Sequence, residues 1–242
     1  MKTLFQPWAL FFVIIIPFAC SQVESSELAS TKAEDVDLRV VLEDVDTEDQ
    51  AAIAAYLQTL DSNTDIEFTA GESFAVFADT ESGLTASETL VASSSFIDFD
   101  NSYQAHVEKT VDGGNYYLSY EDADGVITTI AIPAHTSAAI LAPAEDATVG
   151  PDTVTITWNP DEMPDTGTIA LSVTFDAAGS RSHTSISDIE NTGSYDLDIS
   201  EHSGTATIDL IHEEAYDDFE DYGDSLVRVR TISRVGVSLA SH

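Results

Sequence analysis

Apolar and polar side chains alternate along much of this chain from residue 36 onward. In residues 36–42 the apolar positions recur at every second place. Successive side chains of a strand point to opposite faces, so this period indicates a strand with one buried face. The alternation returns at 74–78, 103–107 and 126–132. The predicted fold class is therefore mainly β.

One segment departs from the two-residue period. Residues 47–50 read Thr-Glu-Asp-Gln, a capping-box pattern typical of a helix N-terminus. Ile53, Tyr56, Leu57 and Leu60 then follow at helical spacing. The sequence predicts one short amphipathic helix here, within a β-rich first domain.

Turn residues punctuate the rest of this first domain. Asp112-Gly113-Gly114-Asn115 and Asp122-Ala123-Asp124-Gly125 each separate two alternating runs. These residue types tolerate positive φ, so both segments predict β-hairpins. Pro133 and a run of small residues without periodicity follow, and we place the domain boundary near residue 138. The first domain is thus predicted to span 36–138.

Short alternating runs continue through the second predicted domain, residues 139–242. They lie at 168–175, 181–187, 194–199, 205–211, 226–232 and 235–239. Together with residues 153–158 they give about seven strands at the spacing of a β-sandwich. Residues 140–160, which include Trp158, resemble the opening strands of fibronectin type III or immunoglobulin-like bacterial modules. The resemblance implies an Ig-like or Fn3-like β-sandwich with Trp158 in its core, and the single cysteine excludes the paired cysteines of antibody domains.

The N-terminus has the pattern of an export signal. Lys2 precedes a continuous apolar run at residues 8–16, and residues 1–19 are predicted to be a signal peptide. Pro17-Phe18-Ala19-Cys20-Ser21 resembles the lipobox of bacterial lipoproteins, which implies cleavage before Cys20 and a lipid on that cysteine. The alternative is an uncleaved anchor with the same orientation. Residues 20–35 are then a lipidated N-terminus and, being polar and Ser-rich, a disordered tether.

The net charge of the chain limits the classes of molecule that we expect it to bind. The chain holds 44 acidic and 8 basic residues, for a formal net charge of −36. Phosphate binding depends on clustered Lys and Arg, so nucleic acid is not expected as a partner. Arg228 and Arg230 lie two apart and therefore on one strand face, as do Asp196 and Asp198; cross-strand ion pairs are the simplest expectation for both.

The densest acidic segment lies between two predicted strands, at residues 213–224. Clustered carboxylates favour hard divalent cations, which makes the segment a calcium candidate, and a solvated loop is the alternative. Apart from calcium, the sequence predicts no cofactor. The candidate ligands are Glu213, Glu214, Asp217, Asp218, Glu220, Asp221 and Asp224.

No catalytic pattern stands out. His212-Glu213-Glu214-Ala215-Tyr216 lacks the second histidine of a zinc-protease helix, and no Gly-x-Ser-x-Gly is present. The sequence therefore predicts no enzyme. We expect a lipid-anchored protein of the cell envelope, delivered to the outer membrane, that binds, displays or supports an envelope protein or glycan. A surface enzyme, or an enzyme accessory, acting on polysaccharide is the alternative.

Overall fold

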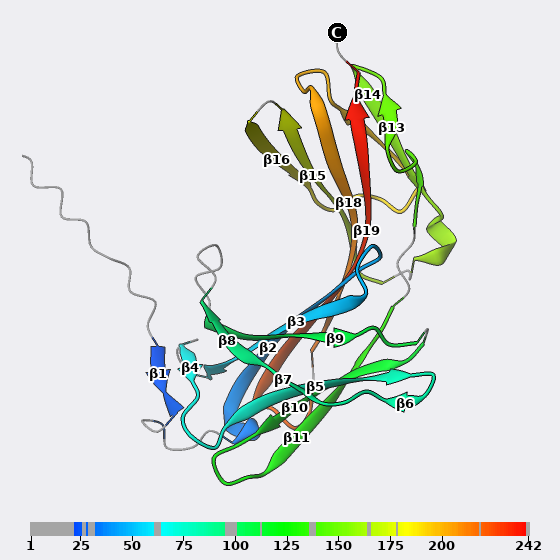
Figure 1. The fold of residues 1–242 in the computed structure, drawn as a ribbon. Helices are drawn as coiled ribbons and strands as arrows, with labels where there is room; N and C mark the ends of the chain where they lie inside the picture. The colour runs from blue at the N-terminus through cyan, green and yellow to red at the C-terminus, as the bar shows by residue number, and fades with distance from the viewer. Residues whose placement is uncertain are drawn as a thin grey trace, which may run out of the picture.

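The computed structural model of the chain is mainly β. It describes residues 22–25, 28, 32–60, 64–94, 101–111, 113–135, 139–163, 166–177, 179–217 and 219–240. In these ranges nineteen strands are joined by turns and by the 3-10 segments η2 (Ala33–Asp35) and η3 (Pro160–Glu162). The strands form two sandwiches set at an angle to each other (Figure 1).

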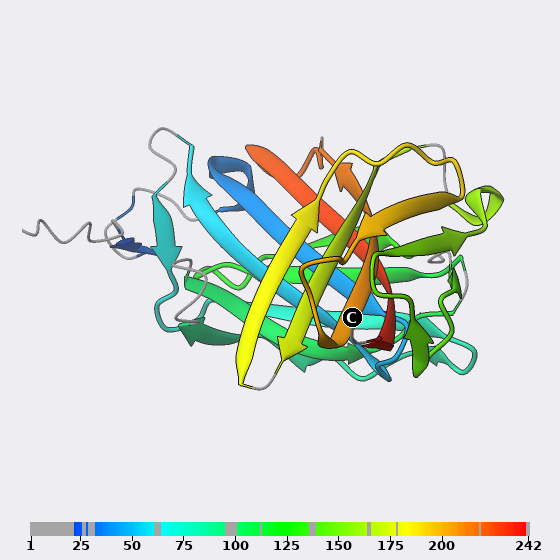
Figure 2. The same ribbon diagram turned by 90° about the horizontal axis from the view of Figure 1, so that it is seen from above.

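One large sheet runs through both sandwiches, and we call it the shared sheet. Its main path is β1-β4-β3-β2-β19-β18-β15-β16, and β8, β9 and β13 pair at its sides. Figure 2 shows β3, β2 and β19 side by side in cyan, blue and orange-red. Its strands are β1 (Gln22–Glu24), β2 (Val36–Val45), β3 (Gln50–Thr59), β4 (Asp65–Glu67), β8 (Val91–Ser94), β9 (Asn101–Glu108), β13 (Ala147–Val149), β15 (Thr168–Ala177), β16 (Ser180–Ile186), β18 (Gly204–Tyr216) and β19 (Asp224–Leu239).

Two smaller sheets cover the shared sheet, one in each sandwich. The first sandwich is closed by β11-β10-β5-β6, with β7 also paired to β5, and the second by β12-β14-β17. The smaller sheets consist of β5 (Ser73–Thr80), β6 (Gly83–Leu84), β7 (Glu88–Thr89), β10 (Asn115–Glu121) and β11 (Ile127–Pro133), and of β12 (Ile140–Ala142), β14 (Thr153–Trp158) and β17 (Ser194–Asp198).

The long hairpin of β18 and β19 belongs to both sandwiches. Val227 and Val229 lie in the core of the first, whereas Val235, Val237 and Leu239 lie in the core of the second. All five have odd numbers, so one face of β19 contacts both cores in turn. The two cores are therefore joined by a continuous strand and not by a linker alone.

The edge of β19 is protected where it passes between the sandwiches. Pairing with β2 ends at Ile232, and pairing with β13 begins at Val237. Between them, Asp46 accepts hydrogen bonds from the Arg234 amide at 3.0 Å and the Ser233 hydroxyl at 2.7 Å, and Glu145 accepts the Gly236 amide at 2.7 Å. These carboxylates satisfy amide and hydroxyl groups at the junction.

The second sandwich has the strand order of an immunoglobulin-like fold. In sequence order β12, β14 and β17 take the places of strands A, B and E, and β15, β18 and β19 those of C, F and G. β16 adds a C′ strand beside β15. Trp158 is only 2% exposed at the end of β14, which confirms its predicted place in the core.

The predicted helix at 47–60 is wrong, because residues 50–59 form strand β3. Its buried side chains include Ala51, Ile53, Ala55 and Leu57, which follow a period of two. The helical spacing arose because alanine occupies positions on both faces and hides the alternation. Alanine also favours helices over strands in isolation, and here pairing with β2 and β9 prevails.

Three further expectations need correction. Part of the predicted disordered tether is ordered: β1 pairs with β4, and η2 buries Ala33. The turn near Gly113 is no hairpin, since β9 and β10 lie in different sheets, whereas Asp122–Gly125 does join the hairpin of β10 and β11. The expected strands at 226–232 and 235–239 are one strand, β19, which places Tyr222 and Val227 in the first core although they lie beyond residue 139.

Candidate functional site

The shared sheet has one face without a covering sheet, which we call the open face. Its side chains alternate with those of the cores: Arg39 lies between Leu38 and Val40, and Asp209 between Ile208 and Leu210. Because the smaller sheets pack on the opposite face in both sandwiches, the open face lies inside the bend of the molecule (Figure 1).

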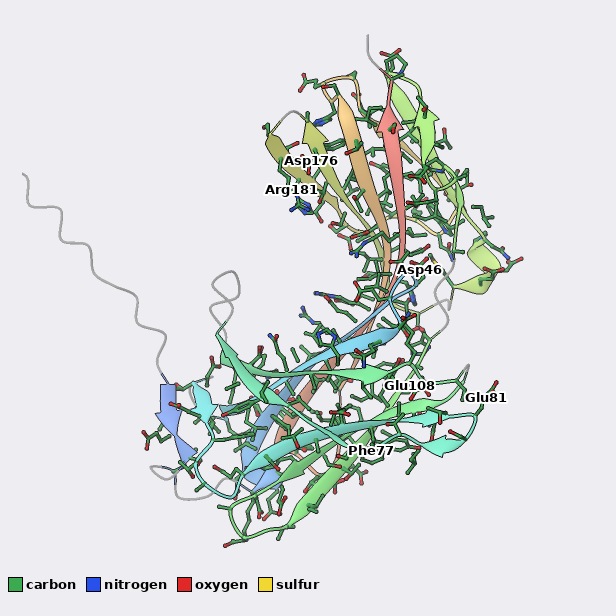
Figure 3. All side chains as sticks on the ribbon, in the orientation of Figure 1. Asp46, Phe77, Glu81, Glu108, Asp176 and Arg181 are labelled. Carbon is green, nitrogen blue, oxygen red and sulfur yellow. The ribbon has the colours of Figure 1, made fainter. Side chains whose placement is uncertain are left out.

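All five arginines of the chain lie on this open face. Four of them alternate along their strands with side chains that point into a core. The fifth, Arg181, pairs across from Asp176, which also lies on the open face. Figure 3 shows Arg181 beside Asp176 on the second sandwich, toward the bend. In a chain with a net charge of −36, this face gathers most of the cationic groups. They are Arg39, Arg181, Arg228, Arg230 and Arg234.

A groove of about 480 Å³ crosses the open face of the first sandwich. Four neighbouring strands, β9, β3, β2 and β19, supply its lining. Ala52 and Ala54 occupy the middle of this surface and carry only methyl groups, so longer side chains on both sides stand above them. Those side chains are Ser102, Gln104 and His106 on one side and Glu43, Arg228 and Arg230 on the other, and Tyr56 follows the alanines on β3 itself.

The two groove arginines are held differently. Arg230 donates to Glu213 at 2.6 Å and to Glu43 at 3.0 Å, and these bonds outweigh burial and raise the pKa of its guanidinium. Arg228 only approaches Glu213, at 4.0 Å, and its side chain is 46% exposed. Because Glu213 is bonded more closely to Arg230 and the Arg228 side chain is half-exposed, Arg228 is open to the groove and to solvent.

The expectation of cross-strand ion pairs is confirmed for Arg230, whereas Arg228 only approaches Glu213, and neither partner is Asp196 or Asp198. Glu213 on β18 and Glu43 on β2 flank β19 and pair with Arg230. Asp196 instead accepts a hydrogen bond from Thr155 at 2.6 Å. Asp198 accepts the Ser200 amide, and this bond lowers the pKa of its carboxyl.

The predicted calcium ligands diverge. Glu213 and Glu214 are neighbours on β18 and point to opposite faces. Asp224 accepts Arg39 at 3.0 Å, and this bond lowers the pKa of Asp224. Glu220 and Asp221 lie in the turn before β19, Asp217 directly follows β18, and Asp218 lies outside the described residues. Among the residues described, no three His, Cys, Asp or Glu side chains form a group suited to a metal ion.

Glu214 belongs to a cluster on the other face of β18. It accepts the Thr166 hydroxyl at 2.7 Å and the Tyr216 hydroxyl, and His135 lies 2.9 Å away. Burial alone would raise the pKa of Glu214, but the bonds from Tyr216 and Thr166 and the nearby histidines lower it on balance. The cluster ties the segment after β11 to β18.

Sequence reasoning identified Arg228 and Arg230 as neighbours on one face, but it missed the groove. The signal was present in Ala52 and Ala54, whose place on a strand was hidden by the helical interpretation. Cys20 and the predicted signal peptide lie outside the described residues. Within the part of the chain that is described, no helix is long and apolar enough to cross a membrane.

Comparisons with known proteins found distant likenesses to solved structures. No protein-family model and no curated protein matches the chain. It is similar to the FN1–FN3 domains of chicken CNTN1, with 12% identity and a TM-score of 0.32, over 88% of this chain and 68% of that one. A marsupial T cell receptor matches with 11% identity and a TM-score of 0.24, over 86% and 74%. Both scores are low, so the description of the second sandwich rests on its own strand order.

Proposed function

We propose that this chain is a non-catalytic binding protein of the cell envelope, delivered to the outer membrane and anchored by a lipid on Cys20, and that its ligand lies in the groove of the open face. The observation that carries the binding role is Arg228. Its side chain is half-exposed at the wall of a groove lined by Val41, Ala52 and Ala54, and its nearest acid is bonded to another arginine. Such a group is available to a ligand.

The build of the groove supports this role. Its lining comes from four strands held by continuous backbone ladders, so the backbone that carries the lining is ordered before a ligand arrives. A rigid site loses less conformational entropy on binding than a site on loops. Gln104 donates to the Ser102 hydroxyl at 2.9 Å, which orients its amide on the groove wall. The anchor at Cys20 is supported by the sequence of residues 17–21.

The test places a larger side chain in the groove and leaves both cores unchanged. Ala54→Leu should place a larger side chain on the floor, and Ala170→Leu makes the same change on the open face of the second sandwich. We expect the full chain carrying Cys20→Ser, which has no lipid to attach it to membranes, to sediment with envelopes from cells that lack the protein, and both variants are compared in this background. Ala54→Leu should lose this association, and Ala170→Leu should keep it.

Two outcomes would contradict this proposal, one for the groove and one for the lipid anchor. Equal sedimentation of both variants and the wild type would contradict the groove as the binding site. For the anchor, the wild type should incorporate labelled fatty acid in its host and Cys20→Ser should not; labelling of the Cys20→Ser variant would overturn the lipid anchor.

A further inference from the structure

Building on the proposed function, we infer that the groove takes an acidic polysaccharide, and that Arg228 binds a carboxylate of one of its sugar units. Three features support this ligand class: the half-exposed guanidinium of Arg228, the paired backbone beneath the groove, and the neutral polar groups of its walls.

Arg228 has the geometry of a carboxylate receptor. A guanidinium presents its donors in a planar fork that matches the two oxygens of a carboxylate. In the groove, Glu43 and Glu213 are both bonded to Arg230, so Arg228 has only a long approach to Glu213, at 4.0 Å. A ligand carboxylate would provide a closer partner.

The backbone under the groove favours a saccharide over a peptide strand. β9, β3, β2 and β19 pair in register across the groove, so their amides and carbonyls are engaged with one another. Strand addition, a common mode of peptide recognition, needs an unpaired sheet edge. The ligand must instead bind through side chains.

The groove walls offer groups that suit sugar hydroxyls. Ser102, Gln104 and His106 form one wall on β9, opposite the arginines of β19. Hydroxyl and amide side chains both donate and accept hydrogen bonds, as sugar hydroxyls do. The low floor at Ala52 and Ala54 leaves room for a sugar ring, and the groove volume of about 480 Å³ lies in the range of ordinary ligand sites.

The charge of the whole chain gives binding an unusual salt dependence. A net charge of −36 repels an acidic polymer at long range, whereas the contact with Arg228 acts at short range. Salt of about 0.1 M reduces the screening length to about 10 Å and so weakens the long-range repulsion first. Affinity should therefore rise between about 0.01 M and 0.15 M NaCl, opposite to the trend of a basic protein.

The experiment uses two matched probes. One is a hexamer of galacturonic acid, and the other is the same hexamer with its carboxylates reduced to hydroxymethyl groups. Binding to the full chain in detergent is measured by calorimetry at 0.15 M NaCl with a calcium chelator, so that no cation bridges protein and ligand. We expect the acidic hexamer to bind at least ten-fold more tightly than the reduced one.

Two variants show which arginine causes the preference for the acidic hexamer. Arg228→Gln should remove it, and Arg181→Gln, an exposed arginine on the open face of the second sandwich, should keep it. Persistence of the preference in Arg228→Gln, or no binding of the acidic hexamer, would overturn the inference. Equal binding of both hexamers that Ala54→Leu abolishes would overturn it as well but would leave the proposed groove standing. Failure of the proposed function appears separately, as envelope association that Ala54→Leu does not change.

Discussion

The open face is one surface of one sheet, but its two halves are built differently. Over the second sandwich, Arg234 donates to Asp209 at 2.7 and 3.1 Å and lies 3.6 Å from Glu48. Over the first, Arg228 has a single carboxylate neighbour at 4.0 Å above an alanine floor. The same residue type on the same strand is thus held by close ion pairs at Arg230 and Arg234 and is left half-exposed at Arg228.

The cores beneath the two halves differ as well. The second core surrounds Trp158 with aliphatic side chains, and its indole donates to Asn191 at 2.9 Å. The first core contains the aromatic residues Phe74, Tyr116 and Tyr120, and it includes a buried carboxylate, Glu72. Variants in each region can show whether this difference between the halves is real.

The largest effect is expected from Trp158→Ala. Removing a buried tryptophan leaves a cavity, and the free energy of unfolding should fall by about 3 to 5 kcal/mol. Because β19 belongs to both cores, the loss should appear in a transition that involves both sandwiches. Denaturant unfolding measures it, with Trp158→Phe as a milder control. A loss below about 1 kcal/mol would contradict the assigned core.

Particular residues show how far the sequence predicts this fold. The strands of the second sandwich and the burial of Trp158 follow from alternation, which is a local property. The shared hairpin does not: β2 and β19 pair although nearly two hundred residues separate them, and alternation alone gives no partner. The groove was missed for a related reason, because Ala52 and Ala54 have side chains too small to reveal their face.

The next effect concerns the first sandwich. Glu72 accepts hydrogen bonds from the Ser25 hydroxyl, from the Thr69 amide at 2.9 Å and from the Tyr120 hydroxyl at 3.2 Å. Glu72→Ala would leave these buried donors without their acceptor and should cost about 1 to 3 kcal/mol. The exposed Glu81→Ala is the matched control and should change stability by less than about 0.5 kcal/mol. Equal stability of the two variants would refute the buried network.

A pH-dependent effect is expected where the two sandwiches meet. The pKa of Glu214 is lower in the folded chain than its usual value of 4.5, so its ionised form stabilises the fold above pH 4.5. This contribution is lost as the pH falls through the lowered pKa. The difference in unfolding free energy between wild type and Glu214→Gln should therefore shrink as the pH falls below 4.5. Glu220→Gln, in an exposed turn, should show no such trend, and a difference that grows at acidic pH would contradict the assignment.

The smallest effects compare the two halves directly. Arg234→Gln removes a two-bond ion pair and should lower stability by about 1 kcal/mol, the upper range for partly exposed pairs. Arg228→Gln removes no close bond and should change it by less than about 0.5 kcal/mol. Thermal or denaturant unfolding distinguishes the two. If Arg228→Gln costs as much as Arg234→Gln, Arg228 is a structural residue.

The most direct test of the account follows the five arginine side chains at once. Each Nε–H gives its own signal in a nitrogen–proton NMR spectrum, and single Arg→Gln variants assign them. Titration with the galacturonic acid hexamer should shift the signal of Arg228 and leave those of Arg181 and Arg234 in place. Shifts centred on Arg181 or Arg234, or equal shifts of all five, would contradict a specific site in the groove.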